Sequence, residues 1–224
     1  KGILSRFGVS LVGCLPGETK DQLRTRVAEA ASKGKLAAIF IETPANPTNH
    51  LVDIEAMVTL AREVGGEKRR VPVLVDNTFL GPVFQRPLAQ GADLVLYSAT
   101  KYLGGHSDVV AGACLGSAEL IQQIKKMRTY LGTLASPWTG WLLLRSLETL
   151  KLRMTRQGES AEAIVQRLLK HPKVEKVYYP GLLREGDPEY SIYRRQSLGP
   201  GAMVSFDVRG GEAAAFRVVG RAHV

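Results

Sequence analysis

One lysine stands in a setting that favours a reactive amine. Residues 94–105, LVLYSATKYLGG, run from an apolar segment through Ser98 and Thr100 to Lys101, and end in two glycines. Glycines let the backbone approach a ligand closely, and a partly desolvated ammonium loses its proton more easily and can attack a carbonyl carbon. The segment predicts a nucleophilic lysine beside hydroxyl donors suited to a phosphate. The alternative is an exposed lysine after a strand, because motifs this short often occur by chance.

Two other apolar runs end in polar loops and indicate the elements that position this lysine. Residues 36–41 lead into ETPANPT, and residues 71–75 lead into DNTFLGP. Apolar runs without alternation are typical of strands buried on both faces of a parallel sheet. Helical spacing over residues 21–32 and over residues 53–64, with Asp53 as N-cap, alternates with the strands. The pattern predicts an α/β fold with right-handed crossovers.

Ligands bind such sheets outside the carboxyl ends of the strands, so we expect Asn46, Asp76 and Lys101 to meet at one edge. Asp76 follows a buried strand directly, where a bare carboxylate is costly unless a cation or a strong donor meets it; its alternative role is that of a turn former. Pyridoxal phosphate chemistry requires three kinds of group together: a lysine for covalent attachment, an acid that keeps the ring nitrogen protonated, and donors around the phosphate.

Three segments resemble the pyridoxal-phosphate enzymes of cysteine and methionine metabolism: ETPANPT, VDNTFLGPVFQRPLAQGADLVLYSATKYLGGHSDVVAG and TYLGTLASPWTGWLLLRSLETLKLRM. This family includes cystathionine γ-synthase, cystathionine γ-lyase, methionine γ-lyase and the O-acylhomoserine sulfhydrylases. The resemblance implies the aspartate-aminotransferase-like fold type I. It also implies that Lys101 carries the cofactor, that Asp76 pairs with the pyridinium nitrogen, that Ser98 and Thr100 bind the phosphate, and that Asn46 lies near the phenolic oxygen of the ring.

The activity implied by the resemblance is γ-elimination or γ-replacement on a small amino-acid substrate, either a sulfur amino acid or an O-acylhomoserine. The family also implies a homotetramer, a dimer of dimers with active sites at the subunit interface. Two alternatives stay open: a cystathionine β-lyase, and a noncatalytic protein that retains the fold. Intact Lys101 and Asp76 speak against the second.

Measured against the family, the chain resembles an internal piece. It begins at Lys1 and enters at once an RFGVSLV segment that lies well inside the cofactor domain of relatives, and the helical pattern from Glu212 to Val224 stops without a cap. On this interpretation several family residues lie outside the chain: the tyrosine that stacks on the ring, the phosphate ligands lent to a neighbouring subunit, and the arginine that binds the substrate carboxylate. We therefore expect the chain alone to be inactive.

We expect residues 1–153 to form part of the cofactor-binding domain and residues 154–224 to begin a smaller C-terminal domain. The first part is expected to end with a helix over residues 138–153. The second part contains the pattern of a helix at 157–170 and of strands at 174–179 and 203–208, with a loop-rich polar segment between the strands at 180–200.

Composition is typical of an enzyme of ordinary size. With 224 residues and 45% hydrophobic content the chain can bury a substantial core. The net charge of +9 comes from scattered basic residues without interleaved aromatics, so solvated surfaces are favoured over nucleic-acid binding. No apolar stretch is long enough to cross a bilayer and no leader is visible, which favours the cytoplasm.

The remaining reactive side chains are interpreted structurally. Cys14 and Cys114 lie far apart in apolar surroundings and lack C-x-x-C spacing, which predicts buried free thiols and neither a disulfide nor a metal site. His106 has no second ligand nearby in the sequence. We expect it to shape the turn behind Lys101, and we expect no metal.

Overall fold

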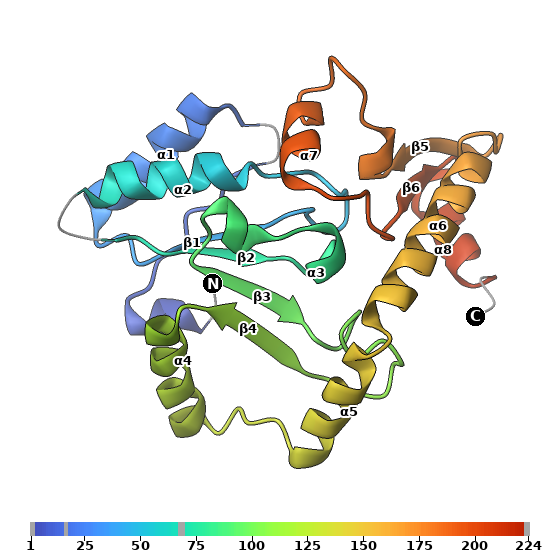
Figure 1. The fold of residues 1–224 in the computed structure, drawn as a ribbon. Coiled ribbons are helices and arrows are strands. Elements are labelled where there is room, and N and C mark those ends of the chain that lie inside the picture. Colours follow the sequence, from blue (N-terminus) through green and yellow to red (C-terminus); the bar gives the residue numbers. More distant parts are fainter. Residues whose placement is uncertain (1–2, 16–17, 67–69, 222–224) are drawn as a thin grey trace.

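A computed structural model describes residues 3–15, 18–66 and 70–221. It contains a four-stranded sheet and a separate two-stranded sheet, with helices packed around both (Figure 1). The strands are β1 (Ile39–Glu42), β2 (Val73–Asp76), β3 (Leu94–Ser98), β4 (Gly112–Gly116), β5 (Val174–Tyr178) and β6 (Ser205–Val208). The helices are α1 (Lys20–Lys33), α2 (Ile54–Gly65), α3 (Gly81–Phe84), α4 (Ala118–Leu131), α5 (Pro137–Leu147), α6 (Leu150–Leu168), α7 (Tyr190–Gln196) and α8 (Gly211–Val219), with 3-10 turns η1 (Leu4–Phe7), η2 (Pro87–Gln90) and η3 (Pro180–Leu182).

The larger sheet has the order β1-β2-β3-β4. β1, β2 and β3 run parallel, and their register aligns Glu42 with Asp76 and Asp76 with Leu96. β4 runs antiparallel to β3, which the sequence did not indicate because its GACLG segment carries few strand-forming residues. The predicted α/β class, with a mostly parallel sheet, is confirmed.

The apolar core lies between this sheet and the pair α1 and α2. Asp53 begins α2 as predicted, since its Oδ1 accepts a hydrogen bond from the Ala56 N–H at 3.0 Å. The prediction of strands buried on both faces is wrong for β1, where Phe40 is 58% exposed between two buried isoleucines, whereas the consecutive residues Leu94 and Val95 of β3 are both buried. Helices cover one face of β1, and no described segment buries Phe40 on the other. The buried strand and helix residues of this core are Val27, Ile39, Ile41, Val73, Val75, Ile54, Met57, Val58, Leu60 and Ala61.

The C-terminal part is organised around the long helix α6. Ala161 and Val165 of α6 pack with Tyr179, which follows β5, and β5 pairs antiparallel with β6. The helix predicted over residues 138–153 is instead two helices, since α5 ends at Leu147 and α6 starts at Leu150. The predicted boundary after residue 153 therefore falls within α6, and the division into two domains stays a prediction.

The loop-rich polar segment 180–200 also contains a short helix, α7, which the sequence did not indicate. Seven residues between glycine- and proline-containing turns give too short a pattern for helical periodicity to show. α7 lies beside the start of α2 in Figure 1. This placement brings the C-terminal part of the chain against the loop that follows β1.

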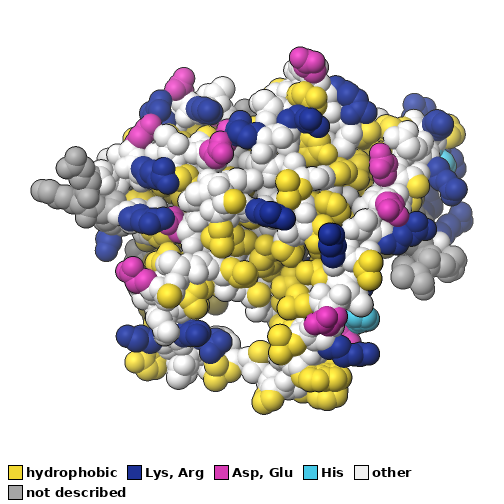
Figure 2. Space-filling model, viewed as in Figure 1, with side chains coloured by type: hydrophobic (Ala, Val, Ile, Leu, Met, Phe, Trp, Pro, Cys, Tyr) yellow, Lys and Arg dark blue, Asp and Glu magenta, His cyan; other side chains and the backbone are white. Residues whose placement is uncertain are grey.

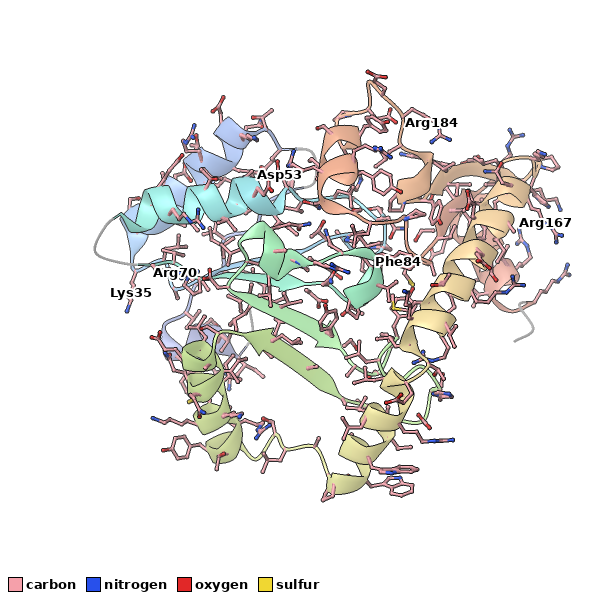
Figure 3. The ribbon with its side chains drawn as sticks, viewed as in Figure 1. Lys35, Asp53, Arg70, Phe84, Arg167 and Arg184 are labelled. Atoms are coloured by element: carbon pink, nitrogen blue, oxygen red, sulfur yellow. The ribbon has the colours of Figure 1, made fainter. Side chains whose placement is uncertain are left out.

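Phe84 connects the loop after β2 to the C-terminal part. A Cβ on Gly158 of α6 would lie 3.3 Å from the Phe84 ring, and one on Gly199 would lie 2.7 Å from it, so the ring needs glycines on both sides. In Figure 3 Phe84 lies at the end of α3, toward α6. The packing fixes the position of the segment that directly follows Asp76.

Cys14 is exposed and Cys114 is half-buried, and both are free thiols. The prediction of burial is wrong for Cys14, because its apolar neighbours in the N-terminal segment, including Leu11 at 66% and Leu15 at 66% exposure, form no core. Within the described residues, no helix is both long and apolar enough to span a bilayer.

Candidate active site

The carboxyl ends of three parallel strands meet at one edge of the larger sheet, as predicted. Glu42, Asp76 and Ser98 are the last residues of β1, β2 and β3. Asn46 lies in the loop that follows β1, and Lys101 lies in the turn that follows β3. The structure therefore brings the predicted residues to the same edge, although they do not all line one cavity.

Lys101 lines an open pocket of about 610 Å³. Its side chain is exposed, so the partial desolvation predicted from its apolar neighbours is absent from this structure. Asp76, Ser98 and Asn46 are not among the lining residues, which come mainly from the segment between β3 and β4 and also include Gln157 of α6 and Met203, before β6. The lining residues are Thr100, Lys101, Tyr102, Gly105, Ser107, Asp108, Val109, Val110, Gln157 and Met203.

Backbone hydrogen bonds hold Lys101 in a tight turn. Its N–H donates to the Ser98 carbonyl at 3.0 Å, and its own carbonyl accepts from the Gly105 N–H at 2.7 Å. Gly105 has a φ of +70°, and a Cβ there would lie 1.9 Å from the Arg153 guanidinium. The glycine is therefore required for the close approach of an arginine, where we expected the approach of a ligand.

Arg153 connects α6 to this turn. Its Nη1 donates to the Tyr102 carbonyl at 2.9 Å, and its Nη2 donates to the Ser146 carbonyl at 2.9 Å. His106 bonds to the Gly104 carbonyl through Nδ1 at 2.7 Å, and since a carbonyl only accepts, Nδ1 is the donor. The prediction that His106 shapes the turn is confirmed.

Asp76 is held by a threonine that sequence reasoning missed. Its Oδ1 accepts from the Thr78 N–H at 3.0 Å and from the Thr78 hydroxyl at 2.6 Å. The same hydroxyl accepts from the Ser98 N–H at 2.8 Å, so Thr78 bridges the ends of β2 and β3. The sequence does contain a signal for this contact, because a threonine two residues after an aspartate has the spacing of an Asx turn.

The turn-forming role of Asp76 uses only one carboxylate oxygen. No described residue donates a hydrogen bond to Oδ2, and the side chain is half-buried. A carboxylate oxygen without a partner at the edge of the core suits a cationic N–H donor. The two interpretations of Asp76 left open by the sequence are therefore compatible in this geometry.

The two hydroxyls predicted to bind phosphate differ in how they are engaged. The Thr100 hydroxyl accepts from the Ala111 N–H at 3.0 Å and donates to the Ala111 carbonyl at 3.3 Å, so its only proton is in use. Among the described residues, none bonds to the Ser98 hydroxyl. Ser98 is thus the available donor, while Thr100 joins the ends of β3 and β4.

Glu42 is a second carboxyl at this edge, and sequence reasoning did not select it. Its register partner is Asp76 on the neighbouring strand, which places both side chains on the same face of the sheet. Burial and then the negative charge of Asp76 raise the pKa of Glu42, against an opposing hydrogen bond from the Asn46 backbone N–H. The two carboxyls together make the edge attractive to a cation.

This shift predicts a pH-dependent gain in stability for Glu42→Gln. The folded-state pKa of Glu42 lies above its ordinary value of 4.5, so ionised Glu42 opposes folding at neutral pH, and this penalty disappears as the pH falls below 4.5. We expect a higher Tm for the variant at pH 7 and an equal Tm at pH 4. Glu119→Gln, in the first turn of α4, is the control. A variant less stable than the parent at pH 7 would contradict the prediction.

Comparison with known proteins agrees with this geometry. A sequence model of the Cys/Met metabolism PLP-dependent enzymes matches residues 4–224. The chain is 38% identical to the L-methionine gamma-lyase of Porphyromonas gingivalis over 99% of this chain and 53% of that protein. It is 42% identical to a probable cystathionine gamma-synthase of Herpetosiphon aurantiacus, over 90% of this chain and 61% of that protein.

Solved structures give the same result. Cystathionine gamma synthase from Xanthomonas oryzae pv. oryzae, in complex with aminoacrylate and cysteine, matches with a TM-score of 0.78 and 42% identity over 88% of this chain and 49% of that one. Cystathionine gamma-lyase from Lactobacillus plantarum, complexed with L-serine, matches with a TM-score of 0.79 and 36% identity over 93% of this chain and 52% of that one. The predicted fold of PLP-dependent transsulfuration enzymes is confirmed. The chain spans about half the length of the relatives it matches, and it belongs to the family of Cys/Met metabolism PLP-dependent enzymes.

Proposed function

We propose that the protein containing this chain is a pyridoxal-phosphate enzyme that carries out γ-elimination or γ-replacement on a sulfur amino acid or an O-acylhomoserine. The observation that carries the proposal is the meeting of Asp76, Ser98 and the Lys101 turn at one strand edge. Relatives named methionine gamma-lyase and cystathionine gamma-synthase support the substrate class.

The donor set fits this cofactor. Asp76 presents an oxygen without a partner for the ring N–H, Ser98 presents a hydroxyl for the phosphate, and Lys101 presents a primary amine for covalent attachment. We propose Thr100 as a second phosphate ligand, which exchanges its 3.3 Å bond to Ala111 for the phosphate oxygen. Asn46 is proposed to donate to the phenolic oxygen of the ring.

Bound pyridoxal phosphate supplies an electron sink for the substrate carbanion. With the cofactor bound, Lys101 Nζ would serve as the base for the proton on the substrate α-carbon. Asp76 would keep the ring nitrogen protonated, and Thr78 holds Oδ1 and so sets the direction of the other carboxylate oxygen. The tight backbone turn limits where the Lys101 amine can reach.

We extend the proposal to the domain organisation of the chain and to the oligomeric state of the full-length protein. Residues 1–153 are assigned to the cofactor-binding domain and residues 154–224 to the C-terminal domain of a cytoplasmic homotetramer. This part rests on the family resemblance. Exposed hydrophobic side chains support burial in an assembly: Trp138 and Trp141 of α5 are stacked and are 66% and 49% exposed. Figure 2 shows apolar surface in the centre of the face in view.

A substrate panel tests the proposed reaction. The full-length protein is assayed with O-acetylhomoserine, O-succinylhomoserine, cystathionine and methionine, each with and without cysteine or sulfide. We expect 2-oxobutyrate from elimination, a thioether from replacement by cysteine, or homocysteine, a thiol, from replacement by sulfide. Pyruvate from cystathionine would instead indicate a β-lyase, for which a 39% identical cystathionine beta-lyase of Bacillus subtilis is the supporting observation. Dominant transamination with none of these products would rule the proposal out.

A further inference from the structure

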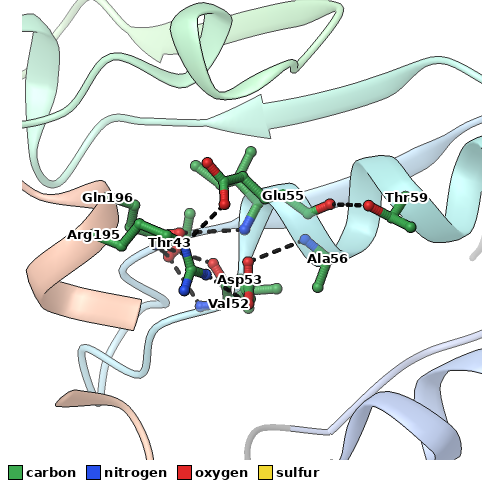
Figure 4. A network of polar contacts seen from close by, with 9 residues as sticks. Thr43, Val52, Asp53, Glu55, Ala56, Thr59, Arg195 and Gln196 are labelled. Carbon is green, nitrogen blue, oxygen red and sulfur yellow. Dashed lines mark hydrogen bonds and ion pairs between the residues drawn. The ribbon is translucent and has the colours of Figure 1, made fainter. Parts of the chain in front are cut away.

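The loop between β1 and α2, residues 43–53, is fastened at its base by one glutamine from the C-terminal part of the chain. Gln196 is 3% exposed at the end of α7. Its Oε1 accepts from the Ile54 N–H at 3.2 Å, and its Nε2 donates to the Val52 carbonyl at 3.1 Å and to the Thr43 hydroxyl at 3.4 Å. Figure 4 shows these contacts converging on the start of α2. One side chain thus contacts both ends of the 43–53 loop.

Thr43 transmits this contact to the candidate active site. It is fully buried, and its hydroxyl also accepts from the Val52 N–H at 3.0 Å, which closes the loop on itself. Its own N–H donates to the Asp76 carbonyl at 3.4 Å. The base of the loop is therefore tied both to Gln196 and to the strand end that carries the proposed cofactor acid.

A neighbouring ion pair reinforces the same junction. Arg195 Nη2 lies 2.7 Å from Asp53 Oδ2, and its Nε lies 2.9 Å from Glu55 Oε2. Asp53 meanwhile caps α2 with its other oxygen. These groups are more exposed than Gln196, and exposed ion pairs contribute little to stability. Gln196 is therefore the stronger candidate for control of the loop.

Residues of the C-terminal part also form hydrogen bonds with the middle of the 43–53 loop. Glu189 accepts from the Leu51 N–H at 2.9 Å and contacts His50 Nδ1 at 2.7 Å. The Asn49 amide donates to the carbonyls of Tyr178 and Met203 at 3.0 and 3.1 Å. With its ends and one side fastened, the loop presents Asn46 outward from a fixed base, and the Asn46 N–H bonds to Glu42.

We propose that Gln196 is a positioning residue for the cofactor edge, because it fixes the base of the 43–53 loop and through it the placement of Asn46. The role of Asn46 in this inference rests on the proposed function. Through Gln196 the C-terminal part of the chain acts on the loop after β1, in addition to lining the Lys101 pocket with Gln157 and Met203. The competing explanation is that Gln196 only joins two parts of the fold, and the two explanations differ in their local consequences.

The first arm of the test is read on cofactor-free, full-length protein by amide hydrogen exchange. Gln196→Met keeps the volume and removes all three hydrogen bonds. We expect exchange at the Ile54 amide to accelerate roughly tenfold, the effect of one lost net hydrogen bond, with β3 unchanged. Tyr179→Phe is the matched control, because it loses a buried bond to the Gly201 carbonyl in the C-terminal part and does not touch the loop. Equal protection at Ile54 in parent and Gln196→Met would overturn the inference.

The second arm asks whether Gln196 acts through Asn46. The dissociation constant for pyridoxal phosphate is measured in parent, Gln196→Met, Asn46→Ala and the double variant. We expect Gln196→Met to weaken binding about tenfold in the parent and less than about twofold once Asn46 is removed. If Gln196→Met weakens cofactor binding by the same factor with Asn46 present and with Asn46 replaced by Ala, then Gln196 only joins two parts of the fold. If the unmutated protein binds no pyridoxal phosphate, the proposed function is wrong. The hydrogen-exchange experiment would still decide whether Gln196 holds the 43–53 loop.

Thr43 supplies a second pair of variants if Gln196→Met fails to fold. Thr43→Val removes the hydroxyl that meets Gln196, and Thr43→Ser keeps it. We expect loss of protection at Val52 and a changed visible circular dichroism of bound cofactor in the valine variant only. The same spectrum and the same protection in both variants would contradict the inference.

Discussion

Replacement of Lys101 by Ala is expected to remove covalent cofactor attachment and to reduce turnover by about 10²- to 10⁴-fold, the usual contribution of a positioned acid or base. Turnover with the substrates of the panel and the cofactor absorbance after gel filtration are the measurements. The turn itself should survive, because it is held by backbone hydrogen bonds that do not involve the amine. Lys126→Ala, an exposed lysine on α4, is the control. Parent-like turnover in Lys101→Ala would show that Lys101 is an ordinary surface lysine.

Replacement of Asp76 by Asn is expected to impair catalysis far more than folding. An asparagine oxygen can still accept both bonds from Thr78, so the turn is retained. The new amide NH₂ then faces the ring N–H, which places two donors together and costs about 1.5 to 3 kcal/mol of lost charge-assisted bonding. This corresponds to roughly a 10- to 100-fold loss, divided between cofactor affinity and turnover.

Asp207→Asn is the matched control for Asp76→Asn, since Asp207 also accepts a hydroxyl hydrogen bond, from Tyr178 at 2.7 Å, but lies in the smaller sheet. Thermal unfolding of both variants separates stability from function. Turnover equal to the parent at saturating cofactor would mean that Asp76 is only a turn former. A large fall in the Tm of Asp76→Asn with unchanged turnover per folded molecule would also mean that Asp76 has only a structural role.

The strand edge was predictable because apolar runs and the polar loops that follow them are local features of the sequence. Apolar runs located β1, β2 and β3 to within a few residues, and the rule that ligands bind at carboxyl ends placed Asp76 and Lys101 together. The burial of the strands was not predictable in the same way. The sequence predicts a buried Phe40, yet its burial depends on which elements cover each face of the sheet, and a local sequence pattern does not contain that information.

Side-chain partners were the least predictable part of the site. Nothing near Lys101 in the sequence indicates that Arg153, far along the chain, occupies the space beside Gly105. Gln196 is hidden for the same reason, because its three partners lie about 140 to 150 residues earlier. Thr78 is the exception, since its spacing from Asp76 is a local signal that could have been used.

Borohydride reduction of the full-length protein loaded with pyridoxal phosphate, followed by peptide mapping, would identify the lysine that holds the cofactor. Reduction fixes the cofactor to the amine that holds it, so the label reports the attachment site without requiring turnover. We expect a single labelled peptide carrying the phosphopyridoxyl group on Lys101. A label on another lysine, or no label at all, would contradict it.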